Sequence, residues 1–64
     1  MKAIEAAIID LLQRRGPCDL DDIVMYLPEL SWGEVSKAIH RMSRKKRVLL
    51  RQLSYSTFKI ALHP

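Results

Sequence analysis

The sequence predicts a small α+β domain in which three helices are followed by a C-terminal β-hairpin. Apolar residues recur at helical spacing in three successive segments, and each segment is bounded by capping or helix-breaking residues. After residue 46 the spacing changes to the two-residue period of strands, in two short runs separated by serine and tyrosine. With 64 residues, the chain has the length of one domain, residues 1–64, with one modest core.

The first helix is predicted over residues 2–15. Arg14 and Arg15 favour the negative end of the helix dipole, and Gly16 followed by Pro17 ends the helix. One stripe of the helix is apolar and consists of Ile4, Ala7, Ile8, Leu11 and Leu12.

The second helix is predicted over residues 19–27. Asp19 is expected to cap its N-terminus, and Asp21 and Asp22 favour the positive end of the dipole in the first turn. Capping explains these three carboxylates better than a metal or acid–base site, because no histidine or cysteine set completes such a site. Pro28 ends the helix, and its apolar face is formed by Leu20, Ile23, Val24 and Leu27.

The third helix, over residues 32–46, has the clearest start signal. Ser31 and Glu34 match the S-x-x-E capping box, and Leu30 and Val35 match the hydrophobic staple around it. Because only Pro28, Glu29 and Leu30 separate the second helix from the cap of the third, these two helices must form a tight helix-turn-helix. The core-facing residues of the third helix are Val35, Ala38, Ile39 and Met42.

The hairpin strands are predicted over residues 47–53 and 57–62, joined by a loop of residues 54–56. This loop length pairs Val48 with Leu62, Leu50 with Ile60 and Gln52 with Phe58, which makes one face of the hairpin almost wholly apolar. On the other face Arg51 then lies opposite Lys59, and like charges on paired strands destabilise a hairpin. These two side chains either splay into water or hold an anion such as phosphate between them.

The charge is distributed unevenly along the chain. Residues 1–30 carry three basic and six acidic side chains, a net charge of −3, whereas residues 31–64 carry eight basic and one acidic, a net charge of +7. Such polarity indicates a surface that faces a polyanion, although any small protein must also expose its charges. No apolar run approaches the roughly 20 residues of a membrane span, and the N-terminal residues lack a signal-peptide pattern, so we expect a cytoplasmic protein.

No catalytic or cofactor motif is present in the sequence. A single cysteine excludes an internal disulfide and a cysteine-rich metal site, and no nucleophile–base pair, phosphate loop or zinc spacing is found. We therefore expect a binding protein without cofactor or metal, rather than an enzyme. Cys18 is expected to be a small, partly buried filler beside the cap of the second helix.

The order of elements resembles the winged helix-turn-helix family over nearly the whole chain, residues 3 to 62. The likeness is carried by the apolar stripe of the first helix, by "DLDDIVMYLP" and by "SWGEVSKAIHRMSRKKRVLLRQL" running into the hairpin. Many members of this family are bacterial or archaeal transcription regulators. Their third helix enters the major groove of DNA, while the hairpin, called the wing, contacts the backbone. The resemblance implies double-stranded DNA as the partner, with modest or little sequence specificity.

The candidate DNA-binding residues come from three parts of the chain. On the sides of the third helix opposite and flanking its apolar face lie Ser36, Lys37, His40, Arg41 and Arg44. The alternative for this face is an ordinary solvated surface. The run Arg44, Lys45, Lys46 and Arg47 contacts phosphates, complements the helix dipole, or does both. Arg51 and Lys59 on the hairpin complete the set of phosphate contacts.

A protein partner is the alternative function. Some winged-helix proteins bind proteins, and this chain has Ser54, Tyr55 and Ser56 where DNA-binding members commonly have a glycine-rich, basic wing tip. Leu49 and Leu53 point outward in the chosen register and either form a contact surface or meet the first helix. A basic face beside exposed leucines also suits an acidic protein partner. A single module buries only about 600–1,000 Å² on DNA, so we expect a dimer or a larger complex. Trp32 is expected to pack against the second helix rather than to contact a partner. Tyr55, at the wing tip, is either a contact to a minor groove or a partner, or an ordinary exposed side chain.

Overall fold

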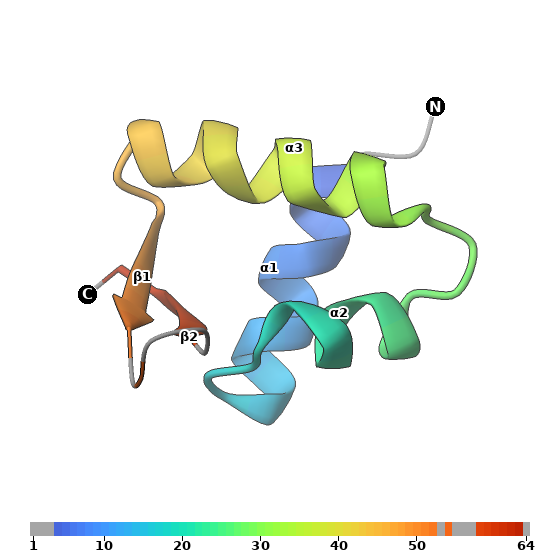
Figure 1. The fold of residues 1–64 in the computed structure, drawn as a ribbon, viewed down its shortest axis with the longest axis horizontal. Helices are drawn as coiled ribbons and strands as arrows, with labels where there is room; N and C mark the ends of the chain where they lie inside the picture. Colours follow the sequence, from blue (N-terminus) through green and yellow to red (C-terminus); the bar gives the residue numbers. More distant parts are fainter. Residues whose placement is uncertain (1–3, 53, 55–57, 64) are drawn as a thin grey trace.

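The computed structural model describes residues 4–52, 54 and 58–63. Its elements are α1 (Ile4–Arg15), α2 (Leu20–Tyr26), α3 (Trp32–Arg44), β1 (Val48–Gln52) and β2 (Phe58–Leu62). The predicted α+β order of three helices and an antiparallel hairpin is therefore confirmed. In Figure 1, α3 runs along the top of the molecule, α1 and α2 lie beneath it, and the hairpin descends from its C-terminal end.

The first two helices begin and end close to the predicted residues. Gly16, with φ of 79°, ends α1 and donates its backbone N–H to the carbonyl of Leu12 at 2.8 Å. The Asp19 carboxylate caps α2 by accepting the backbone N–H of Asp22, also at 2.8 Å. Capping by Asp19 is thus confirmed, and Asp21 and Asp22 lie in the first turn as predicted.

The predicted capping box at the start of α3 is confirmed. The Glu34 backbone N–H donates to Ser31 Oγ at 3.1 Å, and the Ser31 backbone N–H donates to Glu34 Oε1 at 2.8 Å. At the other end α3 stops at Arg44, two residues before the predicted end. The reason is that Lys46 adopts φ of 61°, the left-handed conformation that closes a helix.

The hairpin has the predicted register. Val48 pairs with Leu62, Leu50 with Ile60, and Arg51 with Lys59. β1 begins one residue later than predicted, at Val48, and the last residue of β2 is Leu62, as predicted. Residues 53 and 55–57, which include one predicted residue of each strand, most of the predicted loop and Tyr55, lie outside the described residues.

The second edge of β2 is occupied by the connection between α1 and α2. Cys18 and Ile60 exchange two backbone hydrogen bonds, with N···O distances of 3.0 and 2.6 Å. Cys18 is buried and its Sγ donates to the carbonyl of Gly16, so the cysteine is a structural filler, as predicted. Burial, with a smaller contribution from the Asp22 charge, raises the pKa of the Cys18 thiol and keeps it protonated at neutral pH.

One hydrophobic cluster joins all five elements. Its buried residues are Ile8, Leu11, Leu12, Cys18, Ile23, Leu30, Val35, Ala38, Ile39, Met42, Val48 and Ile60. The four residues predicted to face inward from α3 are all among them. The apolar face of the hairpin is less complete than predicted, because Val48 and Ile60 are buried but Leu50 remains 45% exposed.

Trp32 does not pack as predicted. Its side chain is 51% exposed, whereas Leu30 before the cap and Val35 after it are both buried. These two residues fill the inward positions at the corner between α2 and α3, so the indole at the first helical position stays at the surface.

Candidate nucleic-acid interface

The outward and flanking sides of α3 present the polar residues that the sequence predicts there. Five such residues are exposed to solvent: Ser36, Lys37, His40, Arg41 and Arg44. The four core residues on the opposite side fix the rotation of the helix about its axis. In Figure 1 no other element crosses the upper side of α3. Ser36 and His40 lie on the flank of the helix that borders α2 and the hairpin.

The backbone bonds that end α3 determine where the basic run that follows it lies. The Arg47 backbone N–H donates to the carbonyl of Met42 at 2.8 Å, and the Lys46 N–H donates to that of Ser43 at 3.1 Å. These bonds turn the chain sharply from α3 into β1. As a result Arg44, Lys45, Lys46 and Arg47 are all exposed at one corner of the molecule.

The hairpin adds the predicted pair of opposed cations. Arg51 lies directly across from Lys59 in the ladder; Arg51 is exposed and Lys59 is partly buried. Two like charges at such a pair repel each other, and an anion bound beside them would remove that repulsion.

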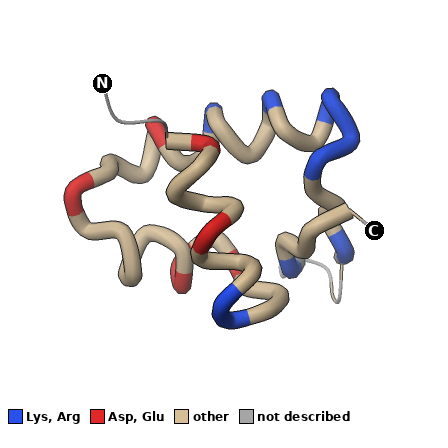
Figure 2. The backbone as a smooth tube through the Cα atoms, turned by 180° about the vertical axis from the view of Figure 1, so that it is seen from behind, with Lys and Arg blue, Asp and Glu red and all other residues tan. Residues whose placement is uncertain are grey.

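Charge is segregated in space as well as in sequence. In Figure 2 most of the Lys and Arg positions lie along α3, at the turn that follows it and on the hairpin, with a further basic site at the end of α1. The Asp and Glu positions lie on α1, on α2, in the segment before α3 and in the first turn of α3. The ten predicted site residues thus occupy the exposed sides of α3, the corner that follows it and the adjoining hairpin.

An acidic residue, Glu5, lies among these basic side chains and is not predicted from the sequence. Glu5, Arg41 and Arg47 form an ion-pair cluster. The Glu5 carboxylate accepts Arg41 Nε–H at 3.1 Å through one oxygen and Arg47 Nη1–H at 3.3 Å through the other. The Glu5 side chain is only 20% exposed, whereas both arginines are about half exposed. The hydrogen bond from Arg41, helped by the charges of Lys45, Arg41 and Arg47, lowers the pKa of Glu5, so the carboxylate is ionised at neutral pH.

A hollow of about 310 Å³ lies beside this ion-pair cluster. Among the described residues it is lined by Arg41, Arg44 and Lys45. Three cationic side chains around one open hollow suit an oxyanion such as phosphate. Arg41 belongs both to this hollow and to the cluster with Glu5.

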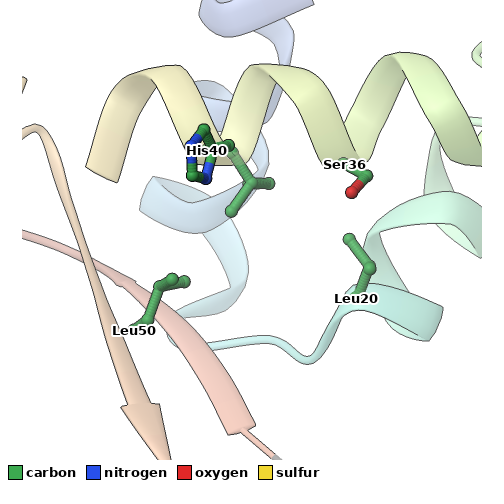
Figure 3. A pocket seen from close by; sticks show the side chains of 5 residues that line it. Leu20, Ser36, His40 and Leu50 are labelled. Atoms are coloured by element: carbon green, nitrogen blue, oxygen red, sulfur yellow. The ribbon is translucent and has the colours of Figure 1, made fainter. Parts of the chain in front are cut away.

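A second, smaller hollow of about 160 Å³ separates α3 from α2 and the hairpin. In Figure 3 Ser36 and His40 border it from α3, Leu20 from α2 and Leu50 from β1, and Ile39 completes its lining. It is mainly apolar, and it explains why Leu50 stays partly exposed although it lies on the inner face of the hairpin.

The described residues offer no other recognisable chemical site. No group of three or more histidine, cysteine or acidic residues among them is arranged to hold a metal ion. Nor does any helix of residues 4–52 combine the length and apolar character needed to cross a membrane.

Comparison with protein-family models, with curated proteins and with solved structures gives no match for this chain.

Proposed function

We propose that this chain is a winged helix-turn-helix protein that binds double-stranded DNA as a transcription regulator or accessory factor. In this proposal α3 enters the major groove through Ser36, Lys37, His40, Arg41 and Arg44. The run from Arg44 to Arg47 and the hairpin pair Arg51 and Lys59 hold phosphates. Recognition through so few base-directed side chains gives modest sequence specificity, so a dimer or a larger complex is part of the proposal.

The observation that carries the proposal is the separation of charge between the two halves of the fold (Figure 2). A duplex is a line of phosphates, and each one neutralised by Lys or Arg releases a condensed counterion and strengthens binding. The uncovered face of α3, with its arginine, lysine, serine and histidine side chains, supports the assignment of this helix to the groove.

The first experiment compares two exposed arginines that each lie in the last turn of a helix, Arg44 of α3 and Arg14 of α1. Binding to a fluorescent mixed-sequence duplex is measured by anisotropy across a series of salt concentrations. We expect the wild-type affinity to fall steeply with salt, and Arg44→Ala to weaken binding about three- to tenfold and to reduce the salt slope by about 1. Arg14 is paired with Asp10 at 2.8 Å on α1, so Arg14→Ala is expected to change the affinity less than about twofold.

Two outcomes would count against DNA binding. One is a wild-type affinity that does not respond to salt, and the other is an equal loss in the Arg44 and Arg14 variants. In the second case the duplex would be responding to net charge alone and not to the face of α3.

A protein partner remains the second candidate, and the exposed apolar side chains favour it. Trp32, Leu49 and Leu50 are each more than a third exposed, and Leu50 borders the apolar hollow beside α3. In this alternative the basic face binds an acidic protein. Absence of duplex binding by the wild type, even at 50 mM salt, would favour this function over the first.

A further inference from the structure

Two arginines from different elements converge on one carboxylate. Arg41 lies on α3 and Arg47 lies in the turn before β1, yet both donate to Glu5 of α1, each to a different oxygen. Paired N–H donors on the two oxygens of an anion are also the arrangement with which arginine recognises phosphate. The Glu5 carboxylate therefore occupies a place suited to an oxyanion.

The hollow beside this ion pair leaves space for a second anion next to the Glu5 carboxylate. Its lining of Arg41, Arg44 and Lys45 includes no acidic side chain among the described residues, and its volume of about 310 Å³ exceeds the space that one phosphate group needs. The hydrogen bond to Glu5 uses only the Nε–H of Arg41, and a guanidinium has five N–H donors. Arg41 can therefore hold Glu5 and a phosphate at the same time.

We propose that the hollow lined by Arg41, Arg44 and Lys45 is a phosphate site, and that Glu5 lowers the affinity of this site for phosphate. The inference rests on the proposed function, where the phosphate belongs to a duplex. Glu5 neutralises part of the charge of Arg41 and Arg47 and repels an incoming phosphate. Like charges several ångströms apart at a protein surface change an equilibrium constant by about three- to tenfold at low salt.

Glu5→Gln tests the inference, and Asp10→Asn is its matched control. Both variants remove one negative charge from α1, and both affect a carboxylate that is paired with arginine. The amide oxygen of glutamine can still accept the Arg41 N–H, so the substitution removes charge and leaves an acceptor in place. We expect Glu5→Gln to bind the duplex about fivefold more tightly at 50 mM salt, with a steeper salt slope. Asp10→Asn is expected to strengthen binding less than twofold.

A second measurement tests phosphate binding at this site independently of duplex binding. The Nε–H signal of Arg41 is followed by NMR while tripolyphosphate, and then the duplex, is titrated into the wild-type protein. We expect both ligands to shift this signal, with the larger shift at a given concentration in Glu5→Gln. Circular dichroism checks that each variant retains the helical content of the wild type.

Each outcome decides a different claim. A Glu5→Gln affinity that is equal to that of Asp10→Asn, or weaker than wild type, would overturn the role of Glu5. An Arg41 signal that neither ligand shifts would overturn the phosphate site, even if the duplex binds elsewhere. A signal shifted by tripolyphosphate in a protein that does not bind the duplex would support the site, and it would remove only double-stranded DNA as the phosphate source.

Discussion

The two ends of α3 are built in different ways. At the N-terminal end Ser31 and Glu34 satisfy each other's backbone N–H groups, and Leu30 and Val35 are buried beside them. The C-terminal end has no side-chain cap among the bonds of the described residues. It closes through backbone bonds to Ser43 and Met42 and through Lys46 in a left-handed conformation, and it carries four consecutive basic residues.

The N-terminal end of α3 therefore contributes to stability through its caps, and the C-terminal end carries the residues that we propose to bind phosphates. Local side-chain bonds hold the first end, which has only one charged residue in its first turn, Glu34. Packing of Met42 holds the second end, where the left-handed backbone conformation of Lys46 opposes folding. The proposed phosphate contacts therefore lie at the end of α3 whose backbone conformation is less favourable.

The largest test of this comparison is Met42→Ala. Met42 is fully buried, and its carbonyl accepts the Arg47 N–H that closes the helix. Truncation leaves a cavity, so we expect the free energy of unfolding to fall by about 2–5 kcal/mol in urea denaturation. In a domain of this size such a loss can remove most of the stability, and Met42→Leu, which preserves volume, is expected to lose less than about 1.5 kcal/mol.

The neighbouring exposed residue provides the contrast. Arg44→Ala lies two positions further along α3 on the solvent side and is expected to change the free energy of unfolding by no more than about 0.5 kcal/mol. If Arg44→Ala were as destabilising as Met42→Ala, the outward face of α3 would be structural, and the division between a packed and a binding face would be wrong.

Features that depend on neighbours in sequence were predictable. The capping box, the Asp19 cap and the inward face of α3 follow from residues three or four positions apart, and the hairpin register follows from the alternation of apolar side chains. The exposure of the α3 site residues followed in turn from the position of the core stripe.

Features that depend on distant segments were not predictable. Glu5 lies 36 residues from Arg41 and 42 from Arg47, and no spacing rule connects them. Trp32 was expected to be packed because tryptophan has a large apolar area, but α2 is short and Leu30 and Val35 already fill the corner. The exposure of Leu50 depends likewise on the distance between the hairpin and the helices α2 and α3. The alternation of residues in the strands does not predict that distance.

Ser31→Ala tests the N-terminal end of α3. The substitution leaves the Glu34 backbone N–H without its side-chain acceptor and breaks the reciprocal box, so we expect a loss of about 1 kcal/mol in the free energy of unfolding. Ser31→Thr restores the hydroxyl and should recover most of that loss. A loss in Ser31→Ala greater than that of Met42→Ala would reverse the comparison, because caps would then matter more than packing.

An effect of the opposite sign is expected for Lys46→Gly. At φ of 61° a side chain costs roughly 1–2 kcal/mol relative to the right-handed conformation, and glycine avoids this cost while losing more chain entropy on folding. We expect a net gain of about 0.5–1 kcal/mol, seen as a rise of a few degrees in the midpoint of thermal unfolding.

Lys45→Gly is the matched control for this gain. It removes the same charge one residue earlier, where φ is −87° and no strain is relieved, so the free energy of unfolding should fall by about 0.5–1 kcal/mol. Under the proposed function both variants lose one phosphate contact, so duplex affinity should weaken in both although their stabilities move in opposite directions. If Lys46→Gly bound the duplex as tightly as wild type, Lys46 would make no phosphate contact, and the strained conformation at the C-terminal end of α3 would have no link to binding.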